Sequence, residues 1–224
     1  MRFLVVEGLD GSGKSTQVDL LRKYFESRAI KYKYLHFPRL EEGVYGQLIA
    51  RFLRGEMGAI EHVDPYLVAL LFAGDRKDAA PTLMNWINED YLVLVDRYVY
   101  SNIAFQCAKL SEENEQELLA EWILELEFVH HQLPMPDKNI FLDVPFDFTR
   151  QSLTEQREGK DRRYLKGAKD IHENDLHFQE QVRKVYHNIC IKKGNLEIID
   201  CADKNGAMKS QDVIFENLKE RLGI

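Results

Sequence analysis

The fold is decided by the stretch Arg2-Phe-Leu-Val-Val-Glu-Gly-Leu-Asp-Gly-Ser-Gly-Lys-Ser-Thr16. Residues 3–6 form a short apolar run, as a β-strand that is buried on both faces requires. The run ends at Gly8, and residues 8–15 fit the pattern G-x-x-x-x-G-K-[ST] at every fixed position. This order predicts a buried strand, a glycine-rich loop and a helix that begins near Gly13.

The glycine-rich loop has the chemistry of a phosphate-binding site. Three glycines allow successive backbone N–H groups to turn inward without Cβ clashes, and these groups form a cradle for oxygen anions. The helix begun at residues 13–16 adds its positive N-terminal end. Lys14 can reach the outer phosphates, and the Ser15 hydroxyl can ligate Mg²⁺. A ligand-free turn is the alternative, but the strand before the loop and the helix after it favour a phosphate site.

Composition indicates one soluble globular domain that spans residues 1–224, with 45% apolar and 30% charged residues. The net charge of -7 argues against a surface that coats nucleic acid. Cys107, Cys190 and Cys201 are scattered without metal-binding spacing, which indicates reduced thiols in a cytoplasmic protein. We expect no signal peptide and no membrane association, because no apolar run approaches the ~18 residues that a membrane span needs.

The order of the apolar runs predicts strands alternating with helices. Strands are expected at residues 3–6, 31–37, 91–95, 139–144 and 196–199. Helices are expected at residues 17–28, 43–54, 64–88 with a break at Pro81, 100–109, 112–128, 147–158, 170–192 and 211–222. Parallel strands need crossover connections, so this order implies an α/β fold with a five-stranded parallel sheet covered on both faces.

Ligands of such sheets lie beyond the carboxyl ends of the strands. The phosphate loop, Pro38-Arg39 and Asp96-Arg97 are therefore expected to surround one crevice. Asp96 directly follows a strand, as does the acidic residue that holds Mg²⁺ or its waters in phosphate-transferring enzymes. Surface ion pairs at strand ends are the alternative, but the neighbouring phosphate loop favours a functional role.

Several longer motifs are similar to those of the thymidylate kinase family. Residues 7–17 resemble its phosphate loop, and residues 161–164, Asp-Arg-Arg-Tyr, resemble its lid. The other matching segments are Phe37-Pro38-Arg39, Phe72-Ala-Gly-Asp-Arg76, Asp96-Arg-Tyr-Val-Tyr-Ser-Asn-Ile-Ala-Phe-Gln106 and Pro134-Met-Pro-Asp137. The resemblance covers residues 1 to about 190. It implies a three-layer α/β/α P-loop kinase fold with a lid at about residues 157–168. It also implies Mg²⁺-dependent transfer of the γ-phosphate of ATP to dTMP, a step of dTTP biosynthesis.

The resemblance also implies an acceptor site for dTMP. Its residues would be Asp10, Phe37, Pro38, Arg39, Phe72, Arg76, Arg97, Ser101, Asn102, Phe105, Gln106 and Tyr164. Phe72 would stack on thymine and Arg76 would hydrogen-bond a base carbonyl, since their i, i+4 spacing puts both on one helix face. Asn102 would read the base N3–H, supported by Ser101. Phe105 would stand against C2′, where a ribose hydroxyl would be crowded.

In the same comparison, Asp10 would take the sugar 3′-OH or help to place the monophosphate and its metal. Arg39 and Arg97 would clamp the acceptor phosphate. The implied ATP-binding residues are Gly8, Asp10, Gly11, Ser12, Gly13, Lys14, Ser15 and Thr16, and the implied metal ligands are Asp10, Ser15 and Asp96.

Phosphoryl transfer brings two anions together, so several cations must converge. Lys14, Mg²⁺ and Arg97 supply three of them. In some family members an arginine follows the loop aspartate, but here that position is Gly11. The further catalytic cations are then expected from the lid, at Arg157, Arg162 and Arg163. A solvated basic loop is the alternative for this segment.

One departure from the family concerns Leu165, which stands where many members have a glutamate after the lid tyrosine. Glu158 and Asp161 are the candidate replacements for that carboxylate. The change leaves open a catalytically weak, nucleotide-binding relative, and a kinase for another deoxynucleotide or for a deoxynucleoside is a second alternative. A GTPase-like switch would need an N-K-x-D guanine reader, and the sequence has none after the fourth predicted strand.

Two further expectations concern metals and partners. His172-Glu173 and His177 suggest a zinc motif, but the histidines are five residues apart and point to different faces of a helix, so we reject it. Family members are usually homodimers, and the resemblance implies an interface at residues 43–54 and 65–80. No nucleic-acid partner is expected.

Overall fold

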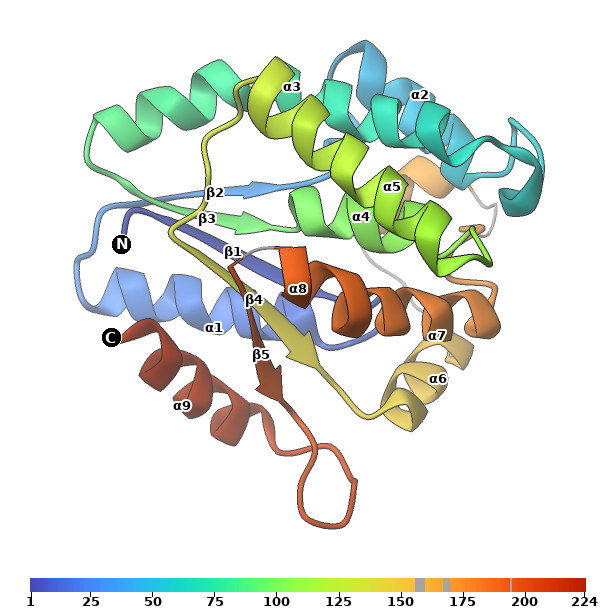
Figure 1. Cartoon of the computed structure of the whole chain (residues 1–224). Helices are drawn as coiled ribbons and strands as arrows, with labels where there is room; N and C mark the ends of the chain where they lie inside the picture. The colour runs from blue at the N-terminus through green and yellow to red at the C-terminus, as the bar shows by residue number, and fades with distance from the viewer. Residues whose placement is uncertain (156–159, 167–169, 194) are drawn as a thin grey trace.

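The computed structural model describes residues 1–155, 160–166, 170–193 and 195–224 (Figure 1). The side chains of Glu61 and of residues 160–162 are not among those described. Its centre is a five-stranded parallel sheet in the order β2-β3-β1-β4-β5. The strands are β1 (Phe3–Gly8), β2 (Tyr32–His36), β3 (Leu92–Asp96), β4 (Lys138–Asp143) and β5 (Leu196–Asp200). The predicted parallel α/β fold is confirmed.

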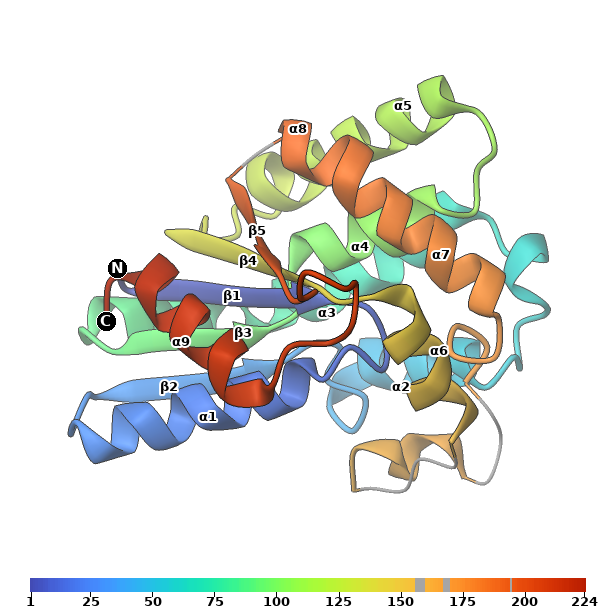
Figure 2. The ribbon, with the colours of Figure 1, turned by 90° about the horizontal axis from the view of Figure 1, so that it is seen from below.

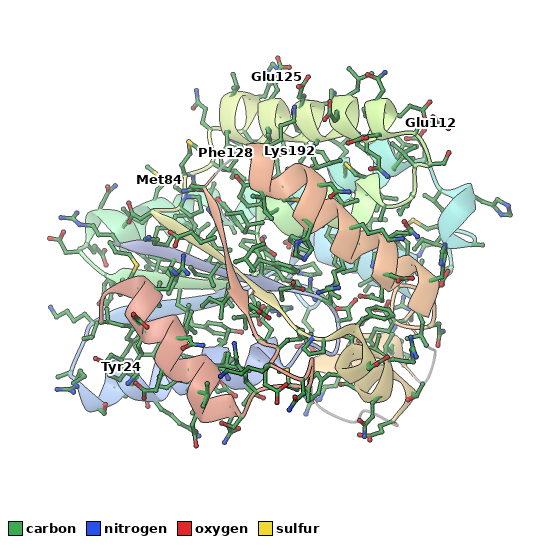
Figure 3. All side chains as sticks on the ribbon, turned by 60° about the horizontal axis from the view of Figure 1, so that its bottom comes forward. Tyr24, Met84, Glu112, Glu125, Phe128 and Lys192 are labelled. Carbon is green, nitrogen blue, oxygen red and sulfur yellow. The ribbon has the colours of Figure 1, made fainter. Side chains whose placement is uncertain are left out.

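Side-chain alternation along β1 explains why the sheet is covered on both faces. Phe3 and Val5 belong to one apolar cluster, whereas Leu4 and Val6 belong to the other. The second cluster is closed by α1 (Lys14–Ser27) and α9 (Gln211–Leu222), which lie together on one side of the sheet (Figures 1 and 2). Tyr24 of α1 lies beside α9 (Figure 3), where its ring meets Phe215 edge-on at 6.2 Å.

The opposite face is covered mainly by helices from the middle of the chain (Figure 1). The helices of the described residues, besides α1 and α9, are α2 (Gly43–Leu53), α3 (Pro65–Asn88), α4 (Val99–Cys107), α5 (Glu113–Leu124), α6 (Phe146–Thr154), α7 (Leu176–Val185) and α8 (Ile191–Lys193). Short 3₁₀ segments lie at Ile60–His62 and Lys160–Leu165, and π-helical turns at Glu125–His130 and Tyr186–Cys190. None of these helices is long and apolar enough to cross a membrane.

The predicted break at Pro81 is wrong, because α3 continues through this residue to Asn88. Asp64 fixes the helix start by accepting hydrogen bonds from the backbone of Tyr66 and Leu67. Burial of residues on both sides of Pro81, such as Ala79, Ala80 and Leu83, favours the helix more than the missing N–H disfavours it.

Three other predicted helix boundaries differ in the structure. The helix expected over 170–192 begins at Leu176, because Asp175 caps its N-terminus through the Phe178 N–H at 2.9 Å. The helix expected over 147–158 ends at Thr154, where Glu155 turns extended. The helix expected over 112–128 changes to a π-helical turn after Leu124. Figure 3 labels Glu112, Glu125 and Phe128, which mark α5 and the π-helical turn after it.

Candidate active site

A cavity of about 590 Å³ opens at the carboxyl ends of β1, β2 and β3. It is lined by the loop after β1, by residues 36–38 after β2 and by residues 96–98 at the end of β3. The predicted site residues that line it are Asp10, Gly11, Ser12, Gly13, Lys14, Ser15, Phe37, Pro38, Phe72, Arg76, Asp96, Arg97, Ser101, Asn102, Phe105, Gln106 and Tyr164. One crevice therefore collects most of the residues that the sequence marked as functional.

The phosphate loop adopts a conformation that its glycines permit. Gly11 and Gly13 have φ of +72° and +73°, in the left-handed region that other residues rarely adopt. At Gly8, a Cβ atom would stand 2.8 Å from the Ser12 hydroxyl. Helix α1 begins directly after Gly13, and no described side chain caps it. Its first N–H groups are therefore available to an anion in the loop.

Lys14 and Asp96 form a buried ion pair at the base of the cavity, with Lys14 Nζ donating to Asp96 Oδ1. His36 Nδ1 lies 3.2 Å from the other carboxylate oxygen. Burial alone would raise the pKa of Asp96, but Lys14 and His36 outweigh it and hold this pKa well below its usual range. The Asp96 carboxylate is therefore ionised and sits beside the phosphate loop.

The side chain of Arg97 also contacts the phosphate loop. Its Nη2 donates to Asp10 Oδ1 at 2.7 Å, and its Nη1 donates to the Ser101 hydroxyl at 3.2 Å. The guanidinium carbon lies 5.2 Å from the centre of the Phe105 ring. Arg97 has φ of +66°, a rare backbone conformation that turns its side chain into the cavity.

A buried hydrogen-bonded set supports the cavity wall formed by α3 and α4. Glu127 accepts from Arg76 Nη2 at 2.6 Å and from Arg76 Nε, and it accepts from Asn102 Nδ2 at 3.0 Å. Asn102 Nδ2 also donates to the Ala69 carbonyl at 3.0 Å. Both amide protons of Asn102 are thus used, and its buried Oδ1 has no partner among the described residues, nor has Gln106 Oε1. Unpaired buried acceptors of this kind suit a ligand that carries an N–H group.

Arg39 does not line the cavity, in contrast to the position expected for a phosphate clamp. Its Nε donates to Asp75 Oδ1 at 2.9 Å and its Nη2 to the Asp75 carbonyl at 2.9 Å. Nη1 donates to Glu42 at 3.0 Å. Asp75 also accepts from the Arg39 backbone N–H, so the segment after β2 is fastened to α3. The reason is the nearby buried carboxylate, which outcompetes an open cavity for the guanidinium.

The segment that was expected to form a lid is described only in part. Arg157 and Glu158 lie outside the described residues, as do the side chains of Asp161 and Arg162. Arg163 is exposed and does not line the cavity.

Tyr164, the tyrosine of the lid motif, lines the cavity, donates to Asp170 Oδ2, and accepts at its carbonyl from Arg54 Nη1 at 2.7 Å. Leu165 is buried at 5% exposure, so an apolar contact fills the place of the family glutamate.

Several residues that the sequence did not mark also build the site. Glu7 is fully buried in β1 and accepts from the backbone N–H groups of Tyr98 at 2.9 Å and Ser101 at 3.2 Å, which fixes the start of α4. Burial raises the pKa of Glu7. A carboxylate inside an apolar strand was the available signal for this residue, because a buried acid needs donors.

Asp170 and His172, which precede α7, also line the cavity. The ring centre of His172 lies 5.0 Å from that of Phe105 and 5.3 Å from that of Phe178. Burial lowers the pKa of His172 to about 3, so its ring is neutral near pH 7 and acts as an aromatic wall. Burial and the nearby Asp10 charge raise the pKa of Asp170 to about 7. A histidine considered only as a metal ligand is thus part of the cavity.

A second, smaller cavity of about 280 Å³ adjoins the phosphate loop. Ser12, Gly13 and Thr16 line it from the loop side. Cys201, Met208 and Lys209 line it from the segment after β5, Gln211 and Ile214 from α9, and Phe148 from α6. Ser12 and Gly13 line both cavities, whereas Thr16, which was also predicted to bind ATP, lines the second cavity and not the first.

A parallel sheet with an anion-binding glycine loop after its first strand defines a P-loop nucleotide-binding protein of the α/β class. The sequence model of the thymidylate kinase family matches residues 6–211 of the chain. The chain belongs to the thymidylate kinase family. Transfer of a phosphoryl group from ATP to dTMP is the reaction of this family, and the chain is an enzyme of this kind.

Individual thymidylate kinases are similar to this chain over most of its length. A thymidylate kinase from Mycobacterium tuberculosis (strain ATCC 25618 / H37Rv) is 33% identical over 184 residues, which cover 82% of this chain and 83% of the relative. A protein of Pyrococcus horikoshii named "Probable thymidylate kinase" is 31% identical over 224 residues, with coverage of 99% and 98%. The structure of thymidylate kinase from Candida albicans has the same fold, with a TM-score of 0.72 at 24% identity and coverage of 99% and 91%.

Proposed function

We propose that ATP and dTMP meet end to end in the 590 Å³ cavity, so that the γ-phosphate of ATP passes to the phosphate of dTMP and yields ADP and dTDP. One observation carries this proposal. The cavity that contains the phosphate loop also contains a fixed donor, Arg76, beside two buried acceptors without described partners, on Asn102 and Gln106. This pattern complements the carbonyl and N3–H groups of a thymine.

The base would be held by the wall of α3 and α4. Phe72 would stack on the ring, and Arg76 would donate to a base carbonyl from Nη1, the nitrogen that Glu127 does not engage. Asn102 would accept from N3–H through Oδ1, because both of its amide protons are already donated to the protein. Ser101 and Gln106 would support this contact.

The sugar and the acceptor phosphate would lie between Phe105 and the phosphate loop. Phe105 would pack on C2′ and so exclude ribose, and Asp10 would accept a hydrogen bond from the 3′-OH. Arg97 would bind the acceptor phosphate, in exchange for part of its contact with Asp10. Arg39 would first have to leave Asp75 to join Arg97 at the acceptor phosphate.

The donor would lie on the loop amides, with Lys14 on its outer phosphates and its nucleoside toward the second cavity. The oxygen atoms of Ser15, Asp96 and Asp10 fit Mg²⁺, which prefers hydroxyl and carboxylate ligands. When bound, Mg²⁺ neutralises phosphate charge. The lid at about residues 157–168, with Arg157, Arg162 and Arg163, would supply further positive charge, and Tyr164 would face the acceptor.

We also propose that the chain forms a single domain and that two copies of it associate as a homodimer in the cytoplasm. Large apolar side chains at Val44 of α2 and at Leu67 and Leu70 of α3 are 66%, 62% and 43% exposed. These are the helices expected at the interface, and burial of this surface would stabilise a dimer. The three cysteines are free, which suits a reducing compartment. Light scattering of the purified chain measures the dimer directly.

The test of the reaction is ADP formation from Mg²⁺–ATP with a panel of dTMP, dUMP, dCMP, dGMP and thymidine. We expect dTDP from dTMP, a weaker reaction with dUMP, and none with thymidine, which lacks the phosphate that Arg97 binds. Lys14→Ala is the matched loss-of-function control. A preference for thymidine over dTMP would replace the proposal with a nucleoside kinase.

A further inference from the structure

Gln179 of α7 holds the phosphate-loop aspartate although the two residues are 169 positions apart in the chain. Its side chain is fully buried. Gln179 Nε2 donates to Asp10 Oδ2 at 2.8 Å, and its Oε1 accepts from the Asp10 backbone N–H at 3.4 Å. One amide therefore contacts both the side chain and the backbone of Asp10, which fixes the position and the rotation of the carboxylate.

The same amide also connects Asp10 to a second wall of the cavity. Gln179 Nε2 donates to the backbone carbonyl of His172 at 3.0 Å. The His172 ring packs against Phe105, the residue that would contact the sugar. The aspartate at one side of the expected sugar and the aromatic pair at another are thus held at a fixed spacing by one buried side chain.

The two oxygens of Asp10 are held by two different donors. Arg97 donates to Oδ1 at 2.7 Å and Gln179 donates to Oδ2 at 2.8 Å. A carboxylate has about four lone-pair sites, so each oxygen can still accept one bond from a ligand. Arg97 is also expected to turn to the acceptor phosphate. When Arg97 shares its hydrogen bonds between Asp10 and the acceptor phosphate, Gln179 is the donor that keeps Asp10 oriented.

We propose that Gln179 is a positioning residue, which orients the Asp10 carboxylate to receive the 3′-OH of the acceptor sugar. This inference rests on the proposed function, in which Asp10 accepts that hydroxyl. A purely structural role for Gln179 would be the packing of α7 against α4 and would affect all acceptors alike. A positioning role changes the preference between acceptors with and without a 3′-OH.

The experiment compares kcat/KM for dTMP and for 3′-deoxy-dTMP in the wild-type enzyme and in Gln179→Met, which keeps the length of the side chain and removes its hydrogen bonds. A hydrogen bond to a charged group corresponds to roughly a tenfold or larger preference for dTMP in the wild type. We expect this ratio to fall to within about threefold of unity in Gln179→Met. Both acceptors are measured on the same preparation, so the folded fraction cancels in the ratio.

Two further variants sharpen the result. Gln181→Met changes the same residue type two positions along α7, where the amide lies 3.4 Å from His177, and should leave the ratio at its wild-type value. Gln179→Glu keeps the size of the side chain but replaces the Nε2 donor with an oxygen beside Asp10, so the ratio should collapse as it does in Gln179→Met.

Equal losses for both acceptors with an unchanged ratio, in either Gln179 variant, would overturn the positioning role. Failure of the proposed function is a separate result, because the wild-type enzyme would then form no dTDP.

Discussion

The most demanding test of the acceptor site is the substitution Glu127→Ala. Glu127 and Arg76 are 0% and 2% exposed, and the carboxylate accepts two bonds from the guanidinium and one from Asn102. Removing one partner of a buried pair leaves an uncompensated charge, which costs about 3–5 kcal/mol. For a domain of this size each kcal/mol lowers Tm by roughly 2–4 °C, so we expect Tm to fall by about 6–20 °C.

The double variant Arg76→Met/Glu127→Leu separates stability from recognition. Replacing a buried ion pair with apolar side chains of similar volume is often neutral or stabilising, so most of the lost Tm should return. The KM for dTMP should nevertheless stay raised at least tenfold, because the donor to the base carbonyl is gone. Calorimetry and initial-rate kinetics measure the two effects. A Tm of Glu127→Ala within about 2 °C of the wild type would refute the energetic reasoning, and a normal KM in the double variant would remove Arg76 from base recognition.

Three further predictions concern the phosphate, the sugar and pH. Arg97→Ala should lower kcat by roughly 10²–10³-fold, since it removes a cation expected at the acceptor phosphate, and unchanged single-turnover rates would contradict this role. Phe105→Ala should raise kcat/KM for ribothymidine monophosphate relative to dTMP, and a constant ratio would show that the ring does not exclude ribose. Burial lowers the pKa of Lys109 to about 7, and its Nζ, which lies 4.7 Å from the centre of the Phe52 ring, has no hydrogen-bond partner within the described part of the chain. The unfolded chain then binds the extra proton between pH 7 and the ordinary lysine pKa, so this group makes unfolding free energy rise with pH in that window. The difference between Lys109→Met and the wild type in urea melts at pH 7 and pH 9 should shrink at the higher pH, and a difference independent of pH would exclude the shift.

The phosphate loop and its surroundings could be predicted because their signals are local. The glycine pattern marks the loop, and a general rule for parallel sheets places Asp96 and Arg97 beside it. The partners of these residues carry no such signal. Gln179 and Glu127 look like ordinary helix residues until the chain folds and brings them against Asp10 and Arg76.

Packing also explains why the break predicted at Pro81 is wrong and why the contacts of Arg39 differ from those expected. Pro81 disfavours a helix locally, yet the buried residues around it keep α3 continuous. Arg39 has the residue type and the position of a phosphate ligand, and its role as a clamp stays a prediction, although in this structure it binds Asp75, 36 residues away. The charged residues near the cavity could be predicted from the sequence. Their ion-pair partners could not, because these partners are distant in the chain and meet only in the folded protein.

The carboxylate of Glu7 has a consequence for how the enzyme tells its two anions apart. Helices α1 and α4 both begin at the cavity, and each could attract a phosphate with its first N–H groups. At α4 the buried Glu7 carboxyl group already occupies that place, since it accepts from the backbone N–H groups of Tyr98 and Ser101. Of these two helix starts, the start of α1 is the one left to attract a nucleotide by its dipole. We therefore expect backbone amides to bind the donor and movable side chains such as Arg97 to bind the acceptor.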